Sequence, residues 1–369
     1  MNSFQPNWAS KPGNTILAIL RERKISTETF VQQMGQPVEC VHQLIYGSKP
    51  ITVETANQLS KVLGASEQFW LNREKIYREA LSSIDKINED KWLKDIPFKE
   101  MVNLGWIRDT DNKLETCLKF FNIENVDQWH KQYRLRVRET VSFRASPTFK
   151  SKLIPITCWL RQGEKIAESI SCKPWNPTAL KGAIESLRKL TKEKKPKTYI
   201  PKLKSICAEC GVAVAIVRTP KTTSTYGAIK FLSKDKALLV LSFRYRSDDQ
   251  FWFTFFHEVG HLLLHESKGI LVDGLTNDDG ASAANSTVQE QEDEANEFAG
   301  ETLIPSRFHD RLKNLTGNTR KIITFANEVG VSPGIVVGQM QHFGYISKAY
   351  LNNFKKRYDW DDIPFESVM

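Results

Sequence analysis

The stretch "FFHEVGHLLLH", from Phe255 to His265, carries an H-E-x-x-H motif inside an apolar run. His257 and His261 are four residues apart, so on a helix their imidazoles lie one turn apart on the same face. Two imidazoles at that spacing can bind one divalent metal ion, and Glu258 is placed to act as a base beside them. The same pattern also occurs by chance on ordinary buried helices. The residues around the motif are therefore needed to distinguish a metal site from a buried helix.

The residues around the motif favour a helix that begins near Ser247. Ser247 and Gln250 match a capping box, and two aspartates follow Ser247, where they suit the positive end of a helix. Four apolar residues then recur at helical spacing, and they are Phe253, Phe256, Val259 and Leu263. The motif is therefore predicted to lie on a capped amphipathic helix.

A catalytic zinc ion needs a third protein ligand, and Glu292 is the predicted one. It lies in "QEDEANEFAGETLIP", a second helical pattern with an apolar stripe of Ala295, Phe298, Ala299 and Leu303. Asn296 is four residues from Glu292 and shares its face, so we expect it to orient a ligand histidine without binding the metal itself. Glu294 is the competing ligand, although it points about 160° away from Glu292. His265 is interpreted as a helix-end histidine.

Three short β-rich runs, each bounded by turn residues, precede the motif helix. They are "GVAVAIV" (Gly211–Val217), "GAIKFL" (Gly227–Leu232) and "ALLVLSF" (Ala237–Phe243). The third run would pair with an extended substrate chain if it formed an exposed edge. After the helix, Ser267–Gln289 is crowded with Gly, Asn, Asp and Ser, which predicts a long mobile loop.

Hydrolysis of a peptide at such a centre is helped by a donor to the developing oxyanion. Tyr226, His309 and His342 are the candidate donors, and the sequence does not choose among them.

The sequence of the N-terminal region predicts a helix-turn-helix. In "ISTETFVQQMGQPVECVHQLIYGSKPITVETANQLSKVLG", Ser26 and Thr52 are predicted helix caps, and Gly35 and Gly47 are predicted turn and helix-end residues. The second helix of such a fold lies in the major groove of DNA, and dimers bind paired half-sites, so a homodimer is expected. The predicted DNA-contacting residues are Val38, Glu39, His42, Gln43 and Lys49.

This recognition face is unusual, because it holds no Arg or Lys apart from the nearby Lys49. Pro37 occupies the position of the expected Ser or Thr cap, and Glu39 repels phosphate unless it accepts a hydrogen bond from cytosine. The alternative interpretation is a helical module that dimerises or holds a protein partner.

Composition and length fit a protein of two or three domains. The chain has 369 residues and a formal net charge of +9, which is consistent with nucleic-acid binding but does not establish it. No apolar run approaches the roughly 18–20 residues that span a membrane, and the N-terminus has no pattern of a secretion signal. We therefore predict a cytoplasmic protein without a membrane partner.

The expected fold class is α+β and mostly helical, with domains at 1–81 (helix-turn-helix), 82–200 (helical connecting region) and 201–369 (metallopeptidase with a small sheet).

The C-terminal motifs resemble those of the ImmA/IrrE metallopeptidases. The resemblance rests on "FWFTFFHEVGHLLLH", "EDEANEFAGETLIP" and "GVSPGIVVGQMQHFGYI", and it covers roughly Cys207 to Trp360. It implies a zincin-like fold in which His257, His261 and Glu292 bind Zn²⁺ and Glu258 is the base. It also implies a regulatory role, because such proteins typically relieve repression by cleaving a repressor or an antitoxin partner. Gly300 and the long loop before Glu292 depart from the expected pattern.

The N-terminal stretch resembles the XRE-type helix-turn-helix of HigA-like antitoxins. The match covers about Pro12 to Asn72 and includes "ITVETANQLSKVLGASEQFWLN". The leading hypothesis is a zinc endopeptidase that regulates transcription or a stress, phage or toxin–antitoxin response. The second is a HigA-like DNA-binding regulator or antitoxin whose metallopeptidase fold is structural or sensory. A third, weaker hypothesis is a helix-rich interaction protein that binds no metal.

Overall fold

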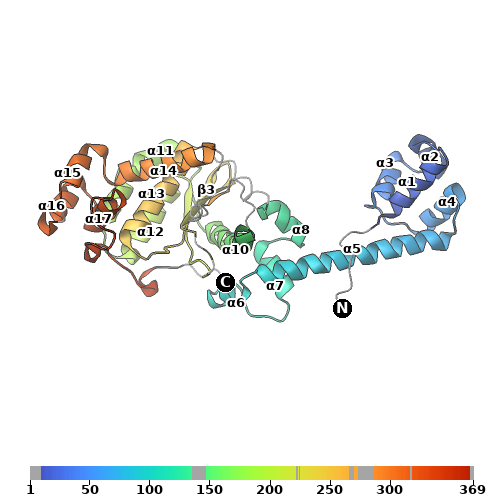
Figure 1. The fold of residues 1–369 in the computed structure, drawn as a ribbon, viewed down its shortest axis with the longest axis horizontal. Helices are drawn as coiled ribbons and strands as arrows, with labels where there is room; N and C mark the ends of the chain where they lie inside the picture. The colour runs from blue at the N-terminus through green and yellow to red at the C-terminus, as the bar shows by residue number, and fades with distance from the viewer. Residues whose placement is uncertain are drawn as a thin grey trace. The chain divides into compact units, whose positions relative to one another are not determined.

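The computed structural model describes residues 10–134, 147–221, 223, 225–265, 270–272, 286–315 and 318–365 (Figure 1). The chain divides into two compact units, Met1–Leu93 and Lys94–Met369. As predicted, the chain is mostly helical, and its strands form one small mixed sheet in the second unit.

The first unit is entirely helical in its described part. Its elements are α1 (Pro12–Glu22), α2 (Thr27–Met34), α3 (Val38–Tyr46), α4 (Val53–Leu63) and the long α5 (Glu67–Asp95). One apolar core holds the unit together, and its largest fully buried members include Ile16, Phe30, Met34 and Trp70.

The predicted caps of this unit are confirmed. The Ser26 hydroxyl accepts a hydrogen bond from the Thr29 amide at 3.1 Å, and the Thr52 hydroxyl accepts one from Thr55 at 3.3 Å. Gly35, between α2 and α3, has a φ of 60°, a left-handed conformation that glycine adopts without a steric penalty. Pro37 begins α3 and provides no side-chain cap. Helices α2 and α3 thus form the helix-turn-helix that the sequence predicts.

Helix α5 runs without interruption through residue 81, where the sequence analysis placed a domain boundary. Its interior holds no proline or glycine, so nothing in the local sequence stops the helix there. The division into three domains stays a prediction, and the two compact units meet within this helix.

The region between α5 and the sheet is helical, as expected. It contains α6 (Phe98–Asn103), α7 (Lys113–Phe121), α8 (Val126–Trp129), the π-helix η1 (His130–Arg134), α10 (Pro147–Glu168), α11 (Pro177–Lys189), η2 (Leu190–Lys192) and α12 (Pro196–Glu209). Helix α10 is anchored to the sheet by a buried charge cluster, in which Glu164 pairs with Arg161 and with Lys230 and accepts a hydrogen bond from Tyr133.

The sheet has four strands in the order β1-β3-β2-β4. They are β1 (Val212–Ile216), β2 (Gly227–Ser233), β3 (Lys236–Leu241) and β4 (Ile270–Val272). Strand β1 is parallel to β3, and the other pairs are antiparallel. Helices α10 and α13 (Asp248–Leu264) lie on opposite faces of the sheet (Figure 1).

The run Ala237–Phe243 does not form an exposed edge, so the condition for pairing with a substrate chain is not met. Its strand, β3, is an inner strand, because Val240 is paired with Ala215 of β1 on one side and with Ala228 of β2 on the other. Both rows of backbone groups are therefore used inside the sheet, and no substrate chain can pair with β3.

Helix α13 packs against β2, against α14 (Ser286–Leu303) and against α17 (Pro333–His342). Gly260 allows the close approach of α14, because a Cβ atom at this position would lie 3.2 Å from the Ala295 Cα. The remaining C-terminal elements are η3 (Ser306–Phe308), α15 (His309–Lys313), α16 (Thr319–Val329), η4 (Asn352–Phe354) and η5 (Trp360–Asp362).

The N-terminus of α13 differs from the predicted capping box. Ser247 is the N-cap residue, but its hydroxyl donates to the Asp249 carboxylate at 2.7 Å instead of accepting from the backbone. Asp248 accepts from the Ser332 hydroxyl and from the Lys356 amide, and burial raises its pKa to about 6. Lys355 pairs with Asp249 at 2.6 Å. These contacts fix the start of the motif helix to the C-terminal part of the chain.

Part of the segment Ser267–Gln289, which was predicted to be a loop, forms regular secondary structure. Strand β4 lies within it, and α14 begins at Ser286, three residues before its predicted end. The other residues of that prediction lie outside the described residues. Within the described parts of the chain, no helix is both long enough and apolar enough to cross a membrane.

Gly300 interrupts the helix-forming sequence of α14, and replacing it with alanine is expected to stabilise the protein. A Cβ atom there would meet only the Gln339 amide nitrogen, at an ordinary contact distance of 3.8 Å. Alanine in a helix interior is more favourable than glycine by up to about 1 kcal/mol, so the free energy of unfolding should rise by about 0.5–1 kcal/mol. Chemical denaturation monitored by circular dichroism measures this, and a decrease in stability would contradict it.

Candidate metal centre

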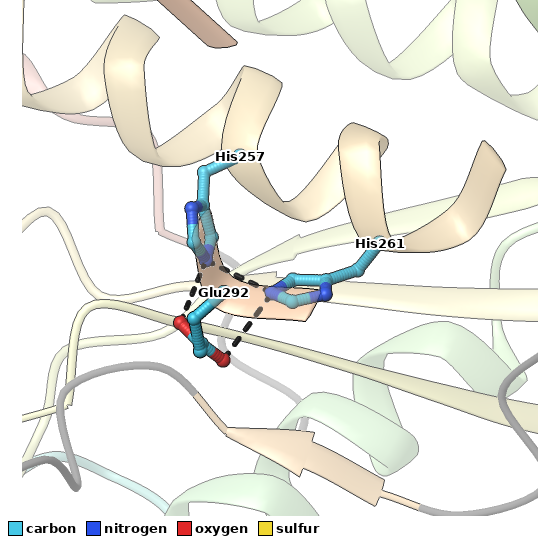
Figure 2. Close-up of side chains that lie close together, drawn as sticks. All are labelled: His257, His261 and Glu292. Carbon is cyan, nitrogen blue, oxygen red and sulfur yellow. Dashed lines mark hydrogen bonds and ion pairs between the residues drawn. The ribbon is translucent and has the colours of Figure 1, made fainter. Parts of the chain in front are cut away.

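His257, His261 and Glu292 form one cluster between α13 and α14. The two Nε2 atoms lie 3.0 Å apart, and each is 3.4 Å from an oxygen of the Glu292 carboxylate. Figure 2 shows the three side chains pointing toward one another. One ligand atom from each residue lies within 4.8 Å of the others, a grouping that can hold a metal ion. These three residues are the ligands predicted from the sequence, and the structure brings them together.

The local fold explains this convergence. One helical turn separates the two histidines on α13, so both imidazoles leave the same face of the helix. The close contact of Gly260 with Ala295 brings α14 near enough for Glu292, one turn before Asn296, to reach them. Glu294 lies on another side of α14 and contacts His265 instead, at 2.9 Å.

The outer nitrogens of both histidines also have partners. The Asn296 Oδ1 lies 3.0 Å from His257 Nδ1, and because an amide oxygen only accepts, this contact assigns the proton to Nδ1. The lone pair of His257 Nε2 is then directed toward the cluster. His261 Nδ1 lies 3.1 Å from His265 Nδ1. The sequence predicts that Asn296 orients a ligand histidine. The contact of His265 with His261 was not predicted, although their four-residue spacing places them on the same face of a helix.

The electrostatics of the cluster favour the protonation states that bind a cation. Burial lowers the pKa of His261, which is 2% exposed. Burial acts to raise the pKa of Glu292, but hydrogen bonds and charge interactions with the two histidines outweigh it and lower the pKa to about 2. Near neutral pH the imidazole of His261 is therefore neutral and Glu292 is a carboxylate, the forms in which these groups bind metal.

The donor set fits a zinc ion. Two imidazole nitrogens and one carboxylate oxygen match the His₂Glu set of catalytic zinc sites, which keep a fourth position for water or substrate. His257, His261 and Glu292 would hold the ion, with Asn296 orienting His257.

Glu258 follows the first histidine and is fully buried. Its carboxylate lies against Gly227, the first residue of β2, where a Cβ atom would come within 2.2 Å of Glu258 Oε1. The absence of a side chain at residue 227 thus makes the space that the Glu258 carboxylate occupies. No sequence pattern predicts this contact between Gly227 and Glu258, because the two residues belong to different elements.

A cleft of about 570 Å³ opens beside the cluster, and His257 and Asn296 are in its wall. Tyr226 and His342, two of the predicted oxyanion donors, line this cleft. The Tyr226 hydroxyl lies 3.0 Å from that of Tyr245, and their rings are stacked. The third candidate, His309, does not line the cleft; its Nε2 lies 3.0 Å from the Ile304 carbonyl oxygen.

The predicted DNA-contacting face is exposed on α3. Val38, whose side chain is 56% exposed, lies in the first turn, and Glu39, His42 and Gln43 are also exposed. Gln43 donates to the Glu39 carboxylate at 3.3 Å, which occupies part of the acceptor capacity of Glu39. Lys49 follows the helix and is half-buried.

A histidine pair on a helix, a carboxylate from the next helix and a small mixed sheet behind them define a domain of the metallopeptidase type. The comparisons with known proteins agree. The family model Peptidase_M78, described as the IrrE N-terminal-like domain, matches residues 212–339. An uncharacterized HTH-type transcriptional regulator, YddM of Escherichia coli (strain K12), is 32% identical over 77 residues, which is 20% of this chain and 82% of that protein. The chain therefore belongs to the family of HTH-type transcriptional regulators and carries an IrrE N-terminal-like domain.

Replacing Asn296 with alanine is expected to weaken zinc affinity by about 10–100-fold, the usual effect of losing a partner that orients a ligand histidine. Asn296→Asp retains an oxygen acceptor for His257 Nδ1 and should keep most of the affinity. Competition with a chromophoric chelator measures both constants. Equal affinities of the wild type and Asn296→Ala would show that the 3.0 Å contact does not orient the ligand.

Zinc binding is expected to weaken as the pH falls, with a midpoint below the ordinary histidine pKa of about 6.5. Protons compete with the metal for imidazole nitrogen, and the lowered pKa of His261 shifts this competition to lower pH. Zinc content after equilibration between pH 8 and pH 4.5 measures the midpoint. Release that is half complete above pH 7 would contradict the expected protonation states.

Proposed function

We propose that this protein is a zinc-dependent endopeptidase of narrow specificity, with a DNA-binding module at its N-terminus. The proposal rests on one observation above all, the convergence of two imidazoles and a carboxylate from two helices. The buried Glu258 follows the first of these histidines in the sequence of α13. A purely structural metal site has no use for a buried carboxylate at that position.

When bound, a zinc ion supplies Lewis acidity, which acidifies water and polarises a peptide carbonyl. His257, His261 and Glu292 would hold the ion, and Asn296 would keep the ring of His257 in its binding tautomer. The Glu258 carboxylate accepts the proton of the attacking water and passes it to the leaving amine. Gly227 leaves the space in which that carboxylate lies. Tyr226 and His342 are the donors in the cleft wall that are available to the developing oxyanion.

We further propose that the substrate is a regulatory protein, such as a repressor or an antitoxin. The pairing of a peptidase-type domain with a helix-turn-helix supports this, because α3 can place the enzyme at a promoter where such a partner is bound. Cleavage would then change transcription in a stress, phage or toxin–antitoxin response.

The peptidase proposal is tested by searching for new protein N-termini in cells that express the wild type or Glu258→Gln. A peptidase of narrow specificity need not cleave a general protease substrate such as casein. The readout is therefore the whole set of protein N-termini, determined by mass spectrometry. A small group of N-termini that appears only with the wild type is the expected result. Identical sets under every inducing condition, with zinc bound, would exclude peptidase function.

The alternative is a DNA-binding regulator or antitoxin in which the metal is structural or sensory. The match to YddM favours a regulatory function, because that protein is described as a transcriptional regulator. The two proposals differ in which residues matter. If reporter expression responds to His42→Ala and Gln43→Ala but not to Glu258→Gln, the regulator alone is supported. If Glu258→Gln abolishes the response, the peptidase is supported.

A further inference from the structure

A second cavity, of about 590 Å³, adjoins the cleft beside the metal cluster. The two share wall residues, including Phe253, Asn296 and His342. Helices α13, α14 and α17 all contribute residues to the second cavity. Because the two spaces share a wall, a polypeptide bound in the cleft can place one side chain in the second cavity. We call this space the side-pocket.

The wall of the side-pocket combines an apolar surface with carboxylates. Its apolar part includes Phe253, Leu303, Ile335 and Phe343, and two glutamates of α14, Glu297 and Glu301, lie in the same wall. Glu301 Oε2 accepts a hydrogen bond from the Ser306 amide at 3.1 Å, which fixes this carboxylate. Among the described residues that line the side-pocket, none is Lys or Arg.

A third acceptor in the wall lacks a partner. Gln339 is 6% exposed, and its amide nitrogen donates to the Gly300 carbonyl at 3.2 Å. Its Oε1 has no hydrogen-bond partner among the described residues. A buried acceptor without a donor carries a free-energy cost, which a ligand that brings N–H groups would remove.

The cleft itself also carries cationic side chains. Lys348, Lys355 and Arg357 line it, and the Lys355 ammonium pairs with Asp249. These cations disfavour a cationic side chain in the cleft, whereas Glu297 and Glu301 favour one in the side-pocket.

We propose that the side-pocket selects substrates by binding one cationic side chain, arginine or lysine. The aliphatic stem packs on the apolar wall, and the head donates to the glutamates and to Gln339 Oε1. This inference rests on the proposed peptidase function and adds the class of substrate side chain that the site recognises.

Binding, not cleavage, provides the test. The probes are pools of fluorescein-labelled hexapeptide amides, each with one fixed position and random residues elsewhere. The protein is the full-length Glu258→Gln chain with added Zn²⁺. At one position, arginine and lysine pools should bind at least about five-fold more tightly than norleucine or citrulline pools, and added salt should reduce the difference. Citrulline has the shape of arginine without its charge.

Two variants of the Glu258→Gln protein locate the effect. Glu297→Gln with Glu301→Gln removes the charge, and Gly300→Leu fills the side-pocket; each should reduce the preference to less than about two-fold. Glu290→Gln with Asp310→Asn removes two charges from exposed positions outside the side-pocket and should retain the preference. Gly300→Ala controls for the change in helix propensity, and thermal denaturation checks the folding of every variant.

Equal binding of all pools, tighter binding of norleucine, or a cation preference that survives in both variants would overturn the proposal. The peptidase proposal can fail independently. If the wild type cleaves no protein but Glu258→Gln prefers arginine through Glu297 and Glu301, only the peptidase function is refuted.

Discussion

Replacing Glu258 with glutamine is expected to reduce the rate of substrate cleavage by about 10²–10⁴-fold, the usual contribution of a general base. Glutamine has nearly the same shape as glutamate, so it fits the fully buried space against Gly227, but it cannot accept the proton from water. Glu258 is not one of the three residues of the metal cluster, so zinc content should not change.

The measurement is kcat and KM for the protein substrate, with zinc determined on the same samples. The loss should appear in kcat with little change in KM. Glu290→Gln makes the same chemical change at an exposed position of α14 and should behave as the wild type. Full activity of Glu258→Gln would remove this residue from the mechanism, and loss of zinc in that variant would make the activity result uninformative about a base.

Replacing Gly227 with alanine is expected to reduce kcat by about the same amount as Glu258→Gln. The added methyl group would lie 2.2 Å from Glu258 Oε1 and 2.7 Å from its Cγ, closer than atoms can approach. The carboxylate is fully buried, so it can move only by displacing its neighbours. Overpacking of this kind typically costs about 1–3 kcal/mol of stability.

This variant needs a readout that a general loss of stability would not affect. Below the unfolding temperature, zinc content should stay at one ion per chain while kcat falls and KM changes little. Gly182→Ala, at a helical glycine where an added Cβ meets no atom within 4 Å, is the matched control and should leave kcat unchanged. A Gly227→Ala protein with normal kcat would show that Glu258 does not need its present position.

The features that local sequence determines were predicted well. The caps Ser26 and Thr52, the turn at Gly35 and the apolar stripes of the motif helices all depend on residues within a few positions. The cluster of His257, His261 and Glu292 was also predictable, because helical geometry separates Glu292 from Glu294 by about 160° and places only one of them near the histidines.

The structural features that were not predicted from the sequence depend on contacts between distant segments. Strand β3 is an inner strand because β1 and β4 occupy the two edges, and strand order is not encoded in any single strand. The contact of Gly227 with Glu258 joins a strand to a helix for the same reason. At the start of α13, the predicted capping box failed because the Ser247 hydroxyl has a carboxylate partner, Asp249, two residues away.

X-ray absorption at the zinc edge tests the central claim most directly. For the wild type loaded with zinc it should give two imidazole nitrogens at about 2.0–2.1 Å and oxygen ligands at about 2.0–2.2 Å. In Glu292→Ala, binding should weaken and the carboxylate oxygen should be lost. Sulfur ligands at about 2.3 Å, or zinc binding that persists unchanged without His257, His261 and Glu292, would contradict the account.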